Sequence, residues 1–203
     1  MKKSKYVGKT REEAINQATI ELQELEKDLY IKEVEVKSGL FSKKVEIEVA
    51  TKEDVIEFIK EYLKNLIKNM NLTANIEIKK REDRVSFTIY TENNAILIGK
   101  NGKTLDAITT IVKQAVHKEI GTYFNLTIDI GEYKVQQQKR IESLAKRVAR
   151  EVGKSKIAAK LDPMNSYERR LVHTVLADHP KVITESEGEE PNRFVVIKPK
   201  EDE

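Results

Sequence analysis

The sequence predicts an α+β fold built from three small modules that follow one another along the chain. Segments with alternating apolar and polar residues, which indicate half-buried strands, are interleaved with segments whose apolar residues recur every three or four positions, which indicate helices. The chain has 203 residues, of which 39% are hydrophobic and 35% are charged. This composition favours several small modules with much surface over one large core. The expected module boundaries are 1–51, 52–132 and 133–203.

The first module, residues 1–51, is expected to have the order β-α-β-β. A short strand is predicted around Tyr6-Val7, and Thr10 with Glu13 has the spacing of a capping box that starts a helix. The apolar stripe of that helix comprises Ile15, Ala18, Leu22, Leu25 and Leu29. A turn at Ser38-Gly39 then joins two strands, whose alternating apolar residues are Val34 and Val36 in the first and Val45, Ile47 and Val49 in the second.

The second module, residues 52–132, is expected to have the order α-β-β-α-α-β. Its first helix follows an N-cap signal at Thr51 and has a buried stripe of Val55, Ile59, Tyr62, Leu63, Leu66 and Met70. A hairpin follows, with alternation at Ala74, Ile76 and Ile78 and again at Val85, Phe87 and Ile89. Two helices joined by a glycine-containing turn then lead to the last strand, which contains Leu126, Ile128 and Ile130.

The third module, residues 133–203, is expected to have the order α-β-α-β-β. A basic amphipathic helix is predicted from about Tyr133 to Val152, and Ile157-Ala158-Ala159 is a candidate for a short strand. Asn165 precedes a second helix, with Glu168 three residues later in the capping-box position. A closing hairpin is predicted from the apolar residues Val182, Ile183, Phe194, Val195, Val196 and Ile197.

The charge of the chain is unevenly distributed. The formal net charge is only +3, but residues 133–181 contain 12 basic and five acidic side chains, whereas residues 182–203 contain three basic and seven acidic ones. A basic segment followed by an acidic end suggests an anionic partner for the third module. A solvated helix face that happens to be rich in Lys and Arg explains the same charge equally well.

The turn at residues 99–102, Gly-Lys-Asn-Gly, has three interpretations. Gly102, Lys103 and Thr104 match the end of a Walker A loop, but that motif requires a glycine at position 97, where Leu97 stands. Alternatively, two glycines let a sugar–phosphate backbone approach closely, while the next helix presents its N-terminal amides and lysines add positive charge. The third interpretation is a helix–helix turn that needs glycine only for its backbone angles.

The position of this turn favours the second interpretation. It lies between two helices in an α-β-β-α-α-β string, and Ile96 and Ile98 come just before it. In this context the segment resembles a type II KH domain, whose GxxG loop holds about four nucleotides. The resemblance implies that the turn grips the phosphate backbone and that Ile96 or Ile98 offers an apolar surface to bases.

A second candidate site lies on the second helix of the third module. Arg169 and His173 are four residues apart, so their side chains share a face of that helix. Taken alone, the pair is explained as well by a surface cation and a partly buried histidine. The surrounding residues 161–173, Leu-Asp-Pro-Met-Asn-Ser-Tyr-Glu-Arg-Arg-Leu-Val-His, closely resemble the nucleic-acid-binding R-3-H domain, named for its Arg-x-x-x-His signature. This resemblance implies a second RNA contact through charge and stacking.

A KH domain followed by an R-3-H domain resembles the bacterial Jag/KhpB family, also called SpoIIIJ-associated proteins. The segment Lys37-Ser38-Gly39-Leu40-Phe41 is similar to the core of that family's N-terminal domain, except that Ser42 stands where a glycine is usual. The resemblance implies a cytoplasmic post-transcriptional regulator that binds single-stranded RNA and affects cell division, the envelope or sporulation. It implies a small single-KH-domain protein as a partner. Single-stranded DNA remains an alternative ligand, and an adaptor that docks a membrane insertase through its N-terminal domain remains an alternative function.

No catalytic, metal or cofactor site is predicted. The sequence has no cysteine and only three histidines, and it contains neither an HExxH motif nor a nucleophile elbow. No apolar stretch is long enough to span a membrane and no secretory signal is recognised, so a soluble cytoplasmic protein is expected. The predicted nucleic-acid-binding residues are Ile98, Gly99, Lys100, Asn101, Gly102, Lys103, Arg169 and His173.

Overall fold

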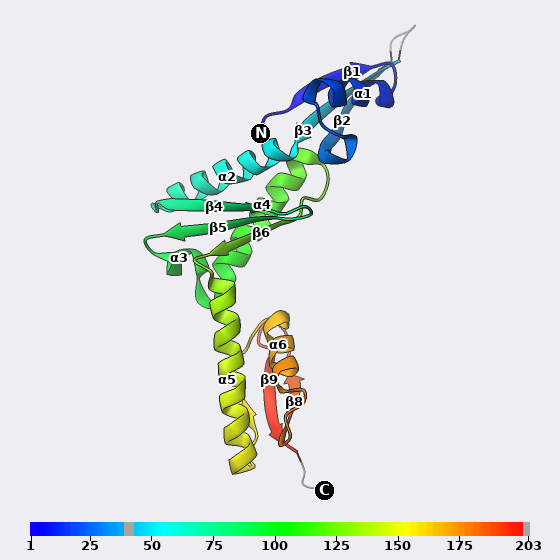
Figure 1. Ribbon diagram of the computed structural model, residues 1–203. Helices are drawn as coiled ribbons and strands as arrows, with labels where there is room; N and C mark the ends of the chain where they lie inside the picture. Colours follow the sequence, from blue (N-terminus) through cyan, green and yellow to red (C-terminus); the bar gives the residue numbers. More distant parts are fainter. Residues whose placement is uncertain (39–42, 201–203) are drawn as a thin grey trace. The chain divides into compact units, whose positions relative to one another are not determined.

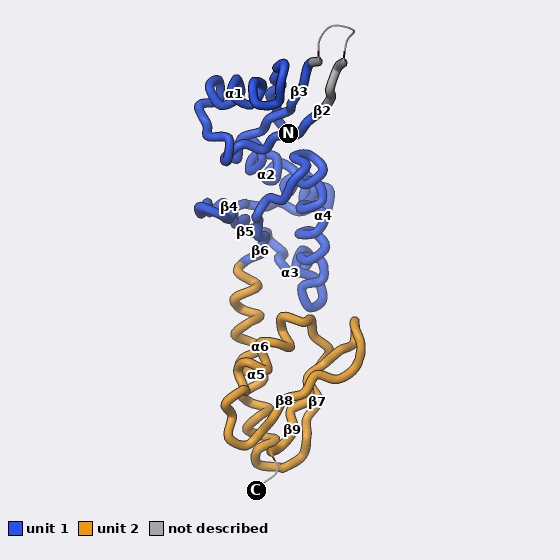
Figure 2. Tube along the Cα trace, turned by 90° about the vertical axis from the view of Figure 1, so that its right-hand side faces the viewer, with its two compact units in different colours: residues 1–131 blue, residues 132–203 orange. Residues whose placement is uncertain are grey.

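The computed structural model describes residues 1–38 and 43–200 (Figure 1). These residues form three three-stranded sheets with their covering helices, in the predicted order of elements. The predicted α+β fold class is therefore confirmed. Two compact units divide the chain, Met1–Gly131 and Glu132–Glu203 (Figure 2). The first unit contains two of the sheets, and the expected module boundaries at 51 and 132 stay a prediction.

The N-terminal sheet is antiparallel and has the strand order β1-β3-β2. Its elements are β1 (Ser4–Gly8), α1 (Arg11–Leu22), the 3₁₀ helix η1 (Glu26–Asp28), β2 (Leu29–Ser38) and β3 (Lys43–Thr51). Their core comprises Tyr6, Ala14, Ile15, Ala18, Leu29, Val45, Ile47 and Val49. The motif at residues 37–41 lies partly outside the described residues.

The predicted extent of the first helix was wrong. The helix ends at Leu22 because Gln23 adopts a left-handed conformation, with φ of 55°. Leu25 therefore lies in the connection and is 62% exposed, whereas Leu29 begins β2 and is buried. The apolar residues keep a spacing of three or four positions across the turn and into β2. Periodicity alone therefore predicted a helix that was too long.

The second sheet has the order β4-β5-β6, with β4 antiparallel and β6 parallel to the central strand. Its elements are α2 (Lys52–Asn69), β4 (Ala74–Lys80), β5 (Val85–Thr91), α3 (Asn94–Ile98), η2 (Lys100–Gly102), α4 (Lys103–Ile120) and β6 (Leu126–Ile130). A complete capping box between Thr51 and Asp54 starts α2. Alternate residues of β5 and β6 are buried.

The third sheet is antiparallel, with the order β7-β9-β8. Its elements are α5 (Tyr133–Ser155), β7 (Ala159–Lys160), α6 (Ser166–Leu176), β8 (Val182–Glu187) and β9 (Phe194–Pro199). The capping box between Asn165 and Glu168 is present. The short strand begins later than predicted, because Ile157 is 71% exposed and only Ala159 and Lys160 pair with β9.

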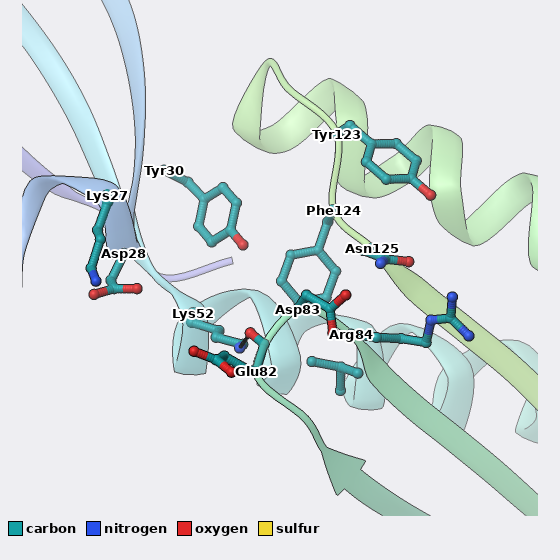
Figure 3. Close-up of a pocket in the computed structure, with 11 residues that line it drawn as sticks. Lys27, Asp28, Tyr30, Lys52, Glu82, Asp83, Arg84, Tyr123, Phe124 and Asn125 are labelled. Atoms are coloured by element: carbon teal, nitrogen blue, oxygen red, sulfur yellow. Dashed lines mark hydrogen bonds between the residues drawn. The ribbon is translucent and has the colours of Figure 1, made fainter.

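Direct contacts join the first two sheets within residues 1–131. The Lys3 ammonium lies 3.0 Å from the Glu119 carboxylate, and the Lys32 ammonium donates to the Lys118 carbonyl at 3.1 Å. At the same junction the rings of Tyr30 and Phe124 are tilted against each other, 5.6 Å apart (Figure 3). These two rings line a pocket of about 250 Å³. Such contacts explain why both sheets belong to one compact unit.

Within the described residues, no helix combines the length and the apolar character that crossing a bilayer requires.

Candidate nucleic-acid interface

The turn between α3 and α4 comprises residues 99–102. Gly99, Asn101 and Gly102 have φ values of 70°, 54° and 78°. A positive φ is unfavourable for most residues with a Cβ, and Gly and Asn are the residues that adopt it most readily. The Gly102 amide donates back to the Gly99 carbonyl at 3.3 Å, which closes the turn. The residue types of this segment are therefore those that its backbone requires.

Gly99 and Gly102 are needed for different structural reasons. A Cβ on Gly99 would collide with the side chain of Thr104, in the first turn of α4. Glycine at position 99 thus permits the close packing of the turn on the helix that follows it. Gly102 occupies the N-cap position of α4 in the left-handed region, with φ of 78° and ψ of 6°. Because it has no side chain, it gives α4 no side-chain cap.

The N-terminus of α4 is electropositive. The Lys103 amide donates to the Lys100 carbonyl, whereas the later amides of the first turn have no partner within the helix. The helix is 18 residues long, and its macrodipole adds partial positive charge at this end. Lys100 and Lys103 are exposed, and neither has an ion pair within residues 1–38 and 43–200. Backbone amides and two unpaired lysines therefore surround the turn.

Apolar side chains lie beside the turn. Helix α3 is only five residues long and buries Leu97 completely. That anchoring leaves Ile96 46% exposed and Ile98 half-buried. A charged loop next to exposed isoleucine side chains can contact both the phosphates and the bases of a flexible strand.

Arg169 lies on the inner face of α6. Arg169 is 8% exposed, and it shares the buried face of α6 with Val172 and Leu176, three and seven positions later. The guanidinium donates to the Met164 carbonyl at 2.8 Å and forms an ion pair with Glu190, also at 2.8 Å. Arg169 thus connects the start of α6 to the loop between β8 and β9.

His173 connects α6 to β8. Its Nδ1 lies 2.6 Å from the Thr184 hydroxyl, and its Nε2 lies 2.8 Å from the Ser186 hydroxyl. Burial lowers the pKa of His173, and the positive charge of Arg169 lowers it further. The neutral ring is therefore favoured, and it accepts a hydrogen bond from one hydroxyl and donates to the other.

The partners of Arg169 and His173 were not predicted from the sequence. Thr184 and Ser186 alternate along β8, so they point to the same side of the strand. That polar alternation could have indicated a hydrogen-bonding partner for the histidine. Glu190 had no comparable signal, since it stands among other acidic residues in a loop.

The eight predicted residues form two groups. Ile98, Gly99, Lys100, Asn101, Gly102 and Lys103 are consecutive and make up the turn, whereas Arg169 and His173 lie together on α6 in the other unit. Across the described chain, no three His, Asp or Glu side chains gather closely enough to hold a metal ion.

Two family models match the chain. The model of the KH domain of KhpA/KhpB matches residues 56–128, and the model of the R-3-H domain matches residues 139–199. The first match contains the whole glycine turn, and the second contains both Arg169 and His173. The predicted KH and R-3-H domains are thereby confirmed.

Similar proteins are known from several bacteria. The RNA-binding protein KhpB of Clostridium symbiosum is 35% identical over 196 residues, which cover 94% of this chain and 88% of that protein. KhpB of Bacillus subtilis is 33% identical over 162 residues, or 78% of each chain. KhpB of Lactiplantibacillus plantarum is 30% identical over 148 residues, which are 73% of this chain but 46% of that longer protein. With such similarity along nearly its whole length, the chain belongs to the KhpB family.

Proposed function

We propose that this protein binds single-stranded RNA and grips the sugar–phosphate backbone at residues 99–102. The observation that carries the proposal is the geometry of that turn. Gly102 places a backbone without a side chain directly at the start of an 18-residue helix, and Lys100 and Lys103 flank it without ion pairs among the described residues. The names of the KhpB relatives, which describe RNA-binding proteins, support the same function.

In this proposal the turn binds phosphate and the neighbouring isoleucines receive bases. The first-turn amides of α4 donate to phosphate oxygens, and the two lysines supply positive charge that does not depend on base sequence. Ile96 and Ile98 offer apolar surface to the bases of the same strand. A clamp of this kind covers about four nucleotides and leaves the RNA chemically unchanged.

Arg169 and His173 have different roles in the second contact with RNA. Arg169 is largely enclosed by its bonds to Met164 and Glu190, so we assign it the role of positioning the start of α6 against the loop between β8 and β9. His173 is only half-buried, which leaves part of its ring accessible for stacking against a base. A strand long enough to occupy both sites gains affinity through effective concentration, whereas a short strand does not.

We further propose a cytoplasmic location, a regulatory effect on cell division, the envelope or sporulation, and a small single-KH-domain partner. The family resemblance is the support for these parts of the proposal. Docking to a membrane insertase through residues 1–51 is the adaptor role that the same resemblance implies.

The experiment is a fluorescence-anisotropy titration of the whole protein. Labelled single-stranded RNA of mixed sequence, the corresponding DNA and a double-stranded RNA are compared at one low salt concentration. We expect the single-stranded RNA to bind, and Gly102→Asp to weaken that binding by tenfold or more, about 1.4 kcal/mol. RNA left unbound by the unmodified protein at micromolar concentration would refute the proposal.

A further inference from the structure

One helix of the second unit carries an unusual concentration of positive charge. We define the α5 cationic face as six exposed side chains on the side of α5 that faces away from its core: Lys139, Arg140, Lys146, Arg147, Arg150 and Lys154. The opposite side buries Ile141, Ala145, Ala149 and Val152. None of the six has an ion pair in the part of the chain that the structure describes, although α5 also contains Glu142 and Glu151. The α5 cationic face is therefore a cluster of cations without ion pairs.

Lysines on another helix do form ion pairs with neighbouring carboxylates. On α2, Lys60 pairs with Glu57 and Lys64 pairs with Glu61, each at 3.1 Å. The α5 cationic face lacks such pairs although it has the same helical geometry. Solvation of a polar helix face explains exposed charge in general, but it does not explain why so many cations gather on one face and stay unpaired.

The α5 cationic face adjoins a groove. Lys146 and Arg150 line one side of a groove of about 600 Å³, and the end of α6 with the residues after it lines the other. That second side includes the apolar side chains of Val175 and Pro180 and the ring of His179. A cationic wall thus faces a wall that contains both apolar and polar residues.

The groove is distinct from the Arg169/His173 site. His173 faces β8 through its bonds to Thr184 and Ser186, whereas Val175 lines the groove beside α5. Two residues along an α-helix correspond to a rotation of about 200°, so positions 173 and 175 lie on opposite flanks of α6. A ligand in the groove therefore contacts a different surface from a ligand at His173.

We propose that the groove and the α5 cationic face bind a second stretch of the RNA backbone. This inference rests on the proposed RNA-binding function and adds a site to it. Lys146 contributes a point charge, and Arg150 contributes a guanidinium that can hold a phosphate through two parallel hydrogen bonds. Val175 and Pro180 give the opposite wall an apolar surface against which a base or ribose packs.

His179 adds a hydrogen-bond donor to the groove. Its Nδ1 accepts from the Lys181 amide at 3.3 Å, so the neutral ring carries its proton on Nε2. An N–H donor can bind a phosphate oxygen or a ribose hydroxyl. Asp178 is the one carboxylate among the residues that line the groove, and it opposes anion binding there.

The arrangement favours a nucleic-acid strand over a membrane surface. Lys139, Lys146, Arg150 and Lys154 follow one another at seven, four and four residues, which corresponds to about 10, 6 and 6 Å along the helix axis. Cations that recur along a helix beside a groove suit an anion with repeating charges. A helix that lies on a membrane needs several large apolar side chains next to its cations, and among the described residues of α5 only Val135 is a strongly exposed large apolar side chain.

The test compares two double variants with equal loss of charge. Lys146→Gln/Arg150→Gln alters the groove wall, and Lys60→Gln/Lys64→Gln alters two paired lysines at the same spacing on α2. We expect only the groove variant to weaken binding of a long single-stranded RNA, by roughly tenfold at 0.1 M salt, and to reduce the salt slope of log affinity by about 1.4. Asp178→Asn should change affinity in the opposite direction.

Equal affinities and equal salt slopes for the two double variants would overturn the inference. Gly102→Asp, measured in parallel, separates this result from a failure of the proposed function: if it abolishes binding while the groove variant binds normally, the clamp stands and the groove does not. Vesicles with anionic lipid form the last arm. Binding of vesicles that depends on Lys146 and Arg150, with RNA affinity unchanged, would assign the surface to a membrane and also overturn the inference. Melting temperatures of all variants confirm that each is folded.

Discussion

Substituting Gly102 by aspartate separates RNA binding from folding. Gly102 adopts φ of 78°, and the left-handed region costs a residue with a Cβ about 1–2 kcal/mol, with Asn and Asp at the low end. The negative charge of aspartate at the N-terminus of α4 offsets part of this strain, by about 0.3–1 kcal/mol. The free energy of unfolding should therefore change by only about 1 kcal/mol.

Binding should respond much more strongly to the same change. The new carboxylate competes with phosphate for the first-turn amides, and losing a hydrogen bond to a charged group costs about 1.5–3 kcal/mol. Repulsion between two negative charges at about 4 Å adds roughly 1 kcal/mol in water. The affinity for single-stranded RNA should fall at least tenfold, and the sum of the two effects predicts a larger loss.

Two further variants isolate the cause. Gly102→Asn has nearly the same shape and tolerates the same backbone conformation but carries no charge, so it should lose less affinity than Gly102→Asp. Gly121→Asn places an equivalent strain at the other end of α4, where φ is 74°, and should leave binding unchanged. Anisotropy titrations measure affinity, and thermal melts measure stability. A folded Gly102→Asp protein with unaltered affinity would refute the clamp.

The remaining predictions concern charge, titration, capping and the Arg-x-x-x-His helix. Lys100→Ala should weaken binding of all RNA sequences alike and reduce the salt slope by about 0.7, as titrations at several salt concentrations will show. Because the pKa of His173 is lowered in the fold, the unfolded chain takes up a proton there first; stability should fall as pH drops below about 6.5, and His173→Gln should flatten this dependence in urea titrations. Asn165→Ala should lower the free energy of unfolding by about 1 kcal/mol, and Asn165→Ser should restore most of it. Arg169→Ala should cost about 1–3 kcal/mol of stability, because it leaves the Met164 carbonyl without its donor; an unchanged melting temperature would contradict the positioning role.

Local signals account for most of the fold that could be predicted. The capping boxes at Thr51 and Asn165 involve residues three positions apart, and such short-range patterns are complete in the sequence. The alternation in β5 and β6 likewise identified strands whose every second residue is buried. The helix that was predicted to continue to Leu29 shows the limit of this approach. Its spacing fitted a helix, but the left-handed conformation at Gln23 ended the helix at Leu22.

The two candidate sites also differ in how much of each could be predicted from the sequence. The turn at residues 99–102 was identified from its glycines and neighbouring helices, because its geometry depends on consecutive residues. The surroundings of Arg169 and His173 could not be derived from the sequence. A spacing of four indicates a shared helix face, but it does not tell whether that face meets solvent or the rest of the fold. Arg169 is buried because Glu190, 21 positions later, and the Met164 carbonyl surround its guanidinium.

The sequence by itself determined the order of the elements, the glycine turn and the concentration of positive charge in residues 133–181. Each of these depends on residues that are neighbours along the chain. Only the tertiary structure decided which cations stay unpaired on α5, which flank of α6 meets β8, and that a groove opens beside Lys146 and Arg150. The physical reason is that burial and pairing depend on segments distant in sequence, and packing of the hydrophobic core brings those segments together.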